Sequence, residues 1–150
     1  MNNNNQKEPR FKVPPLSAKP KVAVVYTTPT TILEDVASAM RMADYQDFLS
    51  PNNTTLLKAN ISWQHYYPAC STTPWQLDGV IGTLKSDGYG DPIPVHNGTV
   101  VVDPVQGWHN NKHRNVEKLH NLSATFLDFP NVKWVDYTPE GELLVLPKIF

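Results

Sequence analysis

The chain has 150 residues, of which 40% are hydrophobic and 18% are charged, and its formal net charge is -1. This composition is typical of a globular domain, and the balanced charge argues against the broad basic face that nucleic-acid binding needs, so we expect no nucleic-acid partner. No apolar run is long enough to span a bilayer and no secretory signal follows Met1, which predicts no membrane partner and a cytoplasmic location. Because Cys70 is the single cysteine, an internal disulfide and a four-thiolate iron–sulfur cluster are excluded.

The amino-terminal segment differs in character from the rest of the chain. Residues 1–20 begin with four asparagines and a glutamine, and they include Pro14, Pro15 and Pro20. Such a segment has little apolar surface to offset the entropy lost on ordering. We therefore expect a disordered tail over residues 1–20, followed by one α/β domain over residues 21–150.

The first predicted unit of the domain is a strand followed by a helix. Residues 22–26 are a continuous apolar, β-branched run of the kind that is buried on both faces of a parallel sheet. Thr31 and Glu34 have the spacing of a capping box, which predicts a helix start. Apolar residues then recur at the three- and four-residue spacing of one helix face: Ile32, Leu33, Val36, Ala39, Met40 and Ala43.

A second strand and helix repeat this order. Residues 54–58 are predicted to form the strand, and the following helix has a well-marked start, because Thr73 can cap it and Pro74 suits its first position. Gln76 completes a Thr-x-x-Gln capping box, and Gly88 is placed to end the helix.

The remaining elements are less regular. Residues 91–96 predict a third strand, and Pro92 and Pro94 indicate that it lies toward an edge of the sheet or starts late. The pattern dissolves over residues 97–115, with a helix resuming near Arg114. The rest of the chain predicts a fourth strand over residues 124–129 and an antiparallel hairpin that pairs residues 132–137 with residues 142–146.

Strands that alternate with helices predict an α/β fold with a three-layer, mainly parallel sheet, flanking helices and a C-terminal antiparallel hairpin. The chain ends on the apolar segment 146–150. From this ending we expect the chain to be the front part of a longer protein, with an exposed edge that self-associates or docks against the missing C-terminal sequence.

Ligands in open α/β sheets bind beyond the carboxyl ends of the strands. Polar residues follow the second and third predicted strands, and hydroxyl groups stand at the start of the second helix, whose N–H groups and dipole favour an anion. We therefore predict a site for an anionic small molecule. The alternative is structural, with Thr73 only a cap, Lys58 a solvated strand end and Asn60 a turn former. The candidate residues are Lys58, Asn60, Thr72, Thr73, His96 and Asn97.

Two further features carry weaker signals. The loop over residues 60–71 is rich in aromatic side chains, which suits either the wall of an organic-ligand site or a contact with another domain. His109 and His113 stand four apart, a spacing that can hold a metal on one helix face, but no carboxylate occupies the usual neighbouring positions. We therefore predict no metal site and expect solvated histidines. The usual nucleotide-binding loops and the nucleophile elbow are absent from the sequence.

The segments 56–60 and 72–74, in this order of strands and helices, resemble the N-terminal part of bacterial members of the family known as domain of unknown function 362. In that family Lys-Pro-Asn typically ends the second strand. Lys58 and Asn60 match this pattern, whereas Ala59 stands where proline is usual and makes the turn less constrained. The resemblance implies an α/β fold of which this chain is the first part. Some relatives carry ferredoxin-like iron–sulfur modules, which this chain lacks the cysteines to match, and the resemblance leaves cofactor and reaction open.

The sequence thus supports two functional predictions. The first is a domain that binds an anionic small molecule at the strand ends, within an enzyme completed by further sequence. The second is a non-catalytic module that docks another domain or subunit through the aromatic loop and an unfinished sheet edge.

Overall fold

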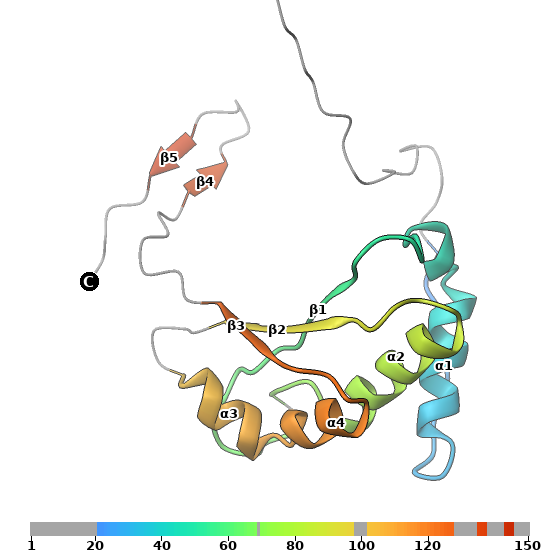
Figure 1. Ribbon diagram of the computed structural model, residues 1–150, viewed down its shortest axis with the longest axis horizontal. Coiled ribbons are helices and arrows are strands. Elements are labelled where there is room, and N and C mark those ends of the chain that lie inside the picture. Colours follow the sequence, from blue (N-terminus) through green and yellow to red (C-terminus); the bar gives the residue numbers. More distant parts are fainter. Residues whose placement is uncertain (1–20, 69, 98–101, 128–134, 138–142, 146–150) are drawn as a thin grey trace, which may run out of the picture.

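A computed structural model describes residues 21–68, 70–97, 102–127, 135–137 and 143–145 of the chain. The tail over residues 1–20 and the apolar ending over residues 146–150 lie outside the described residues. In the described part the chain is mixed α/β, as predicted, with helices and a small parallel sheet (Figure 1). None of the described helices is long and apolar enough to cross a membrane.

Three short strands make the parallel sheet. They are β1 (Leu56–Lys58), β2 (Ile93–Asn97) and β3 (Thr125–Leu127), in the order β1-β2-β3. Lys58 lies opposite Val95, and Asn97 lies opposite Leu127. Because the strands are parallel and in this register, their carboxyl ends lie at one edge of the sheet, as the predicted site requires.

The first predicted strand, over residues 22–26, is wrong. This segment has no regular secondary structure, and the side chains of Val22, Val24 and Tyr26 are 81%, 72% and 96% exposed. A β-branched apolar run favours a strand, but a strand also needs a backbone partner. In the described part of the chain β1 pairs with β2 alone, so no such partner lies beside residues 22–26.

Of the two alternatives for the third strand, the edge position is wrong, because β2 is the central strand of the sheet, whereas the late start is confirmed, because β2 begins at Ile93. Pro94 lies opposite Leu57 and is fully buried. Proline lacks a backbone N–H group, so it removes one ladder hydrogen bond. The apolar environment of Pro94 and the remaining bonds of β2 accommodate that loss in a strand with neighbours on both sides.

Two longer helices pack against each other beside the sheet. They are α1 (Ile32–Met42) and α2 (Pro74–Ser86). The predicted capping box of α1 does not form, because Thr31 Oγ1 donates to the Asp35 carboxylate at 2.6 Å and makes no cap hydrogen bond. The α2 helix begins at the predicted proline, and its buried side chains join the main core, which comprises Ala59, Leu77, Ile81 and Val116.

Two helices of seven residues, α3 (Pro104–Asn110) and α4 (His113–Leu119), follow β2. The sequence pattern dissolves over the residues of α3, whereas α4 confirms the helix predicted to resume near Arg114. The carboxylate of Asp103 caps α3, since its Oδ1 accepts from the N–H groups of Val105 at 2.9 Å and Gln106 at 3.0 Å. Lys112 separates the two helices with a left-handed backbone, at φ 67°. An Asp-Pro helix start was therefore present in the sequence but was not recognised.

The helices α2, α3 and α4 lie on the same side of the three-strand sheet, and α1 packs on α2 (Figure 1). A one-turn 3-10 helix, η1 (Tyr45–Asp47), follows α1. Near the carboxyl terminus β4 (Val135–Tyr137) pairs antiparallel with β5 (Leu143–Val145). The turn predicted to connect them lies outside the described residues.

Candidate functional site

The strand end of β1 is tied to the start of α2 by hydrogen bonds across the aromatic loop. The N–H of Asn60 donates to Thr72 Oγ1 at 2.9 Å, and the N–H of Thr72 donates to the Asn60 carbonyl at 3.0 Å. The side-chain amide of Asn60 also donates to Ser62 Oγ at 2.5 Å and to the Cys70 carbonyl at 3.2 Å. These bonds give Asn60 and the Thr72 hydroxyl a structural role, which was one of the two alternatives drawn from the sequence.

The electrostatic environment of Lys58 differs from that of Asn60 and Thr72. Its Nζ donates to the carbonyl of Ala59 at 2.7 Å, and burial lowers the pKa of its ammonium group. Among the residues that the structure describes, no carboxylate forms an ion pair with Lys58. Partial removal of an ammonium group from water without a counter-charge is unfavourable. The ammonium of Lys58 therefore favours a negative charge beside it.

A buried histidine cluster, made of His96, Trp108, His113 and Glu117, fills the space between β2 and the two short helices. His96 Nε2 lies 2.8 Å from Glu117 Oε1, and Trp108 Nε1 donates to Glu117 Oε2 at 2.8 Å. The side chains of His96 and Glu117 are 1% and 0% exposed. A carboxylate buried this completely persists because both of its oxygen atoms have a hydrogen-bond partner.

His113 connects this cluster to the strand ends. Its Nε2 lies 2.6 Å from the carbonyl oxygen of Thr72, and its ring stacks on that of His96 with centroids 6.0 Å apart and planes 16° apart. Burial is the main cause that lowers the pKa of His113, and the nearby charge of Lys58 acts in the same direction. The cluster therefore lies within electrostatic reach of Lys58, and His113 is held in its neutral form.

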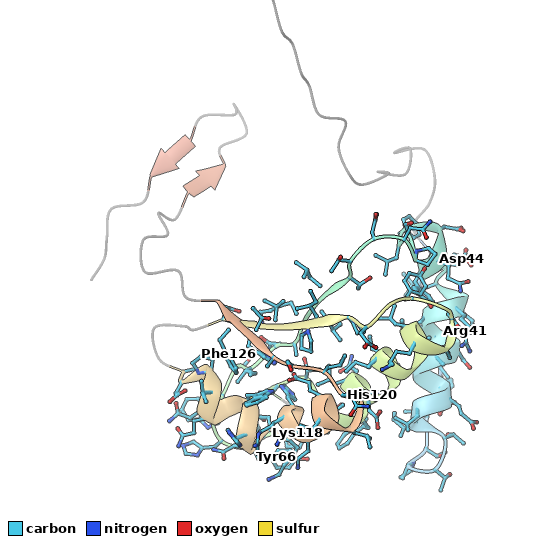
Figure 2. The ribbon with its side chains drawn as sticks, in the orientation of Figure 1. Arg41, Asp44, Tyr66, Lys118, His120 and Phe126 are labelled. Atoms are coloured by element: carbon cyan, nitrogen blue, oxygen red, sulfur yellow. The ribbon has the colours of Figure 1, made fainter. Side chains whose placement is uncertain are left out.

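Aromatic rings and one cation surround the cluster. The ring of Phe126, on β3, lies 5.4 Å from that of His96 and 5.4 Å from that of Trp108 (Figure 2). The guanidinium of Arg114 lies 5.8 Å from the centre of the Trp108 ring. These rings exclude water, which strengthens each electrostatic interaction inside the cluster.

Among the residues that the structure describes, three buried side-chain atoms in and beside the cluster have no hydrogen-bond partner. They are Nδ1 of His96, Nδ1 of His113 and Oγ of Ser71, the residue before Thr72. Buried polar atoms are nearly always paired, so unpaired ones in a native structure require an explanation. Three of them near one strand edge point to a group that completes the site.

The other predicted residues have these positions. Thr73 precedes α2 but makes no side-chain cap bond. Asn97 ends β2 and is half-buried. The expectation of solvated histidines is wrong for His113, which is fully buried. His109 and His113 also do not lie on one face of a single helix, because α3 ends at Asn110 and the left-handed backbone of Lys112 interrupts the helical path between them.

Sequence reasoning missed Glu117 and Trp108, the two side chains that hold His96 in place. Trp108 lies in the stretch over residues 97–115, where no helix was predicted, whereas Glu117 lies in the helix predicted to resume near Arg114. The available signal for Glu117 was one acidic residue beside Val116 on the buried face of that helix, which also carries His113. Buried carboxylates are rare unless they are paired, so that pattern would have indicated a partner without identifying it.

In the described part of the chain, no group of three or more histidine, cysteine, aspartate or glutamate side chains is arranged to hold a metal ion. Comparisons of the chain with models of known protein families, with curated proteins and with solved structures found no match. The candidate site is therefore defined by its own geometry: a largely exposed Lys58 at the end of β1, whose ammonium pKa partial burial lowers, and a buried histidine cluster on the neighbouring strand β2.

Proposed function

We propose that the chain binds an anionic small molecule at the carboxyl ends of β1 and β2. The observation that carries this proposal is the environment of Lys58, whose side chain is largely exposed, whose ammonium pKa is lowered by partial burial, and which forms no ion pair with a carboxylate of the described residues. A carboxylate or phosphate bound there would supply the missing charge and a charge-assisted hydrogen bond.

The start of α2 supports the same conclusion. This helix has 13 residues, and no side chain caps its first turn. The first-turn N–H groups of a helix have no intrahelical partner, and together with the helix dipole they favour an anion. Because Thr72 is hydrogen-bonded to Asn60 just after β1, the start of α2 lies close to the carboxyl end of that strand.

We further propose that this site belongs to an enzyme. In this proposal the sheet is part of a three-layer, mainly parallel architecture of the domain of unknown function 362 type. The parallel pairing of β1, β2 and β3, with their ends at one edge, is what supports it.

Isothermal titration calorimetry of the 150-residue chain with acetate, glycolate, inorganic phosphate and sulfate tests the anion site. We expect Lys58→Met to weaken binding of the preferred anion by more than tenfold and to leave the melting temperature nearly unchanged, because an exposed or half-buried lysine contributes little to stability. Lys118→Met, on the exposed face of α4 (Figure 2), is the matched control and should bind like the parent. Equal effects of the two substitutions, or the absence of binding, would reject the proposal.

One observation favours the alternative function, a module that docks another protein. Trp63, Tyr66 and Tyr67 in the aromatic loop are 47%, 46% and 58% exposed. Exposed aromatic side chains are enriched at protein interfaces. Concentration-dependent sedimentation that Trp63→Ser abolishes, in a chain that binds none of the four anions, would favour this alternative.

A further inference from the structure

A groove lies along the segment that connects η1 to β1. Residues 46–56 line this groove, and its volume is about 1200 Å³. Sites for small molecules usually measure about 300–1,000 Å³ and enclose most of the ligand. This groove instead follows one continuous length of chain, which arches from η1 to β1 (Figure 1). Its size and form suit several residues of an extended peptide better than a compact ligand.

The surface of the groove combines apolar side chains with one negative charge. Phe48, Leu49 and Leu56 line it and are exposed. Asp47 is the single charged side chain among the lining residues, which include no lysine, arginine or histidine. Apolar side chains that gather on an exposed surface mark an interaction site. The groove therefore suits an extended segment that has an apolar face and carries positive charge.

The amino-terminal tail joins the described part of the chain beside this groove. Lys21, the first described residue, forms an ion pair with Asp44, which lies two positions before the first lining residue, Gln46 (Figure 2). An extended chain advances about 3.3 Å per residue, so residues 10–15 can lie up to roughly 20–35 Å from Lys21. That reach allows them to follow a groove that begins next to Lys21.

The sequence of the tail matches the surface of the groove. Residues 10–13 alternate between basic and apolar side chains, so in an extended conformation Phe11 and Val13 share one face and the two cations share the other. The next two residues are prolines, which favour an extended backbone that loses little entropy on binding. Residues 9–20 contain three basic residues and no acidic one, which complements the charge of the groove.

We propose that residues 10–15 of the tail dock within the same chain in the groove along residues 46–56. Phe11 and Val13 contact its apolar side chains, and a cation of the tail lies beside Asp47. The tail has too little apolar surface to become ordered by itself, and the groove supplies the surface that ordering requires. This inference is independent of the proposed anion site.

Paramagnetic relaxation enhancement in the full 150-residue chain tests the inference. Cys70→Ser removes the single native cysteine, which is exposed, and Gln6→Cys then carries a nitroxide label. Position 6 lies 15 residues from Lys21, so the label approaches the groove closely only when the tail docks. We expect it to broaden the backbone amide signals of residues 48–56 much more than those of α3. The same spectra report whether each variant is folded.

Substitutions in the tail provide a matched comparison. Phe11→Ser should lower the docking equilibrium constant about tenfold, because a large apolar side chain is no longer buried. Phe11→Ser combined with Val13→Ser should abolish the selective broadening. Asn2→Ser combined with Asn4→Ser, outside the docking segment, should leave it unchanged.

Substitutions of two exposed carboxylates test the charge of the groove. Asp47→Asn should weaken docking about twofold to fivefold, the usual effect of one exposed ion pair. Glu34→Gln, at the start of α1 and outside the groove, should not weaken it. Equal effects of the two substitutions would reject the contact with Asp47.

A mixed sample identifies the chain whose tail occupies the groove. Spin-labelled chain without ¹⁵N, mixed with ¹⁵N-labelled chain without the spin label, should leave the signals of residues 48–56 sharp. Broadening of these signals in the mixture would show that a second copy supplies the tail, and it would reject docking within one chain. Absence of broadening in the labelled chain, uniform broadening, or a pattern that the double serine variant of the docking segment does not change would each reject the docking site.

Discussion

Gly79 on α2 lies so close to Val36 on α1 that a Cβ atom added to the glycine would be 2.8 Å from Cβ of the valine. Such a distance is shorter than carbon atoms tolerate, and Cβ of Val36 is held rigidly by the α1 backbone. The absence of a side chain at position 79 therefore sets the spacing between the two helices.

Gly79→Ala should lower the free energy of unfolding by about 1–3 kcal/mol, the usual cost of overpacking. Gly82→Ala, one turn later in α2, is the matched control, because its nearest contact would be His120 Cε1 at 4.0 Å. That substitution should stabilise the chain by about 0.5–1 kcal/mol, since alanine has the higher helix propensity. Urea denaturation measures both, and a stabilised Gly79→Ala variant would contradict the close packing of α1 and α2.

Asp87, just after α2, joins the two long helices. Its Oδ1 accepts from Nη2 of Arg41 at 2.6 Å, and its Oδ2 accepts from the hydroxyl of Tyr45 at 2.7 Å. The hydrogen bond from Arg41, followed by that from Tyr45, lowers the pKa of Asp87 to about 2. A lowered carboxyl pKa stabilises the fold above the ordinary value near 4, and this stabilisation is lost as the pH falls toward 2.

We therefore expect Asp87→Asn to cost about 1 kcal/mol at pH 7 and to flatten the loss of stability between pH 4 and pH 2. Asp91→Asn is the control, because Asp91 pairs with Lys85 at 2.8 Å through a carboxylate that is 64% exposed. Guanidinium denaturation followed across this pH range gives both values. Similar curves for the two variants would show that Asp87 is an ordinary surface carboxylate.

Removal of the Glu117 side chain should be among the most damaging single changes. Glu117→Ala leaves the N–H groups of His96 and Trp108 buried without an acceptor, which we expect to cost about 3 kcal/mol or more. Asp78→Ala breaks a similar contact with His120 in a part-exposed position and should cost under about 1 kcal/mol. Thermal and urea denaturation compare the two variants, and equal losses would mean that burial does not distinguish them.

His113 should make stability depend on pH near neutrality, whereas Asp87 does so in the acid range. Burial lowers its pKa in the folded chain, with opposing contributions from Thr72 and Glu117 and supporting ones from His96 and Lys58. Below the ordinary histidine value near 6.5 the unfolded chain then binds the proton more readily, so stability falls as the pH drops from about 7.

His113→Gln keeps a donor for the Thr72 carbonyl but does not titrate. The difference in unfolding free energy between parent and variant should therefore change between pH 7 and pH 5, in the direction that favours the variant at low pH. Urea denaturation at matched ionic strength measures this difference. Parallel curves would show that His113 takes up its proton as easily in the folded chain as in the unfolded one.

The features that the sequence predicted well are those with local signals. The start of α2 is marked by Pro74 at its first position, which acts within one helical turn. The shared edge at which β1 and β2 end follows from the single strand–helix–strand unit β1–α2–β2. Residues 22–26 have the composition of a strand, but their state depends on a partner strand that no local pattern encodes.

The centre of the site could not be predicted for a similar reason. His96 and Glu117 are 21 positions apart, and they meet because α4 packs beside β2. The direction of the Glu117 side chain depends on the left-handed backbone of Lys112, which sets the path of the chain from α3 to α4. Periodicity identifies the face of an element, but it does not specify which polar residues of two separate elements will meet.

The two short helices also determine in which conformations of the chain the histidine cluster is assembled. With seven residues each, α3 and α4 fall well below the length at which an isolated helix is stable in water, so their helical state depends on packing against the rest of the fold. We expect their backbone amide protons to exchange with solvent together, as one cooperative unit. Each opening of that unit withdraws Glu117 and Trp108 from His96, so the fixed orientation of this histidine is a property of the closed conformation and lasts only as long as that conformation does.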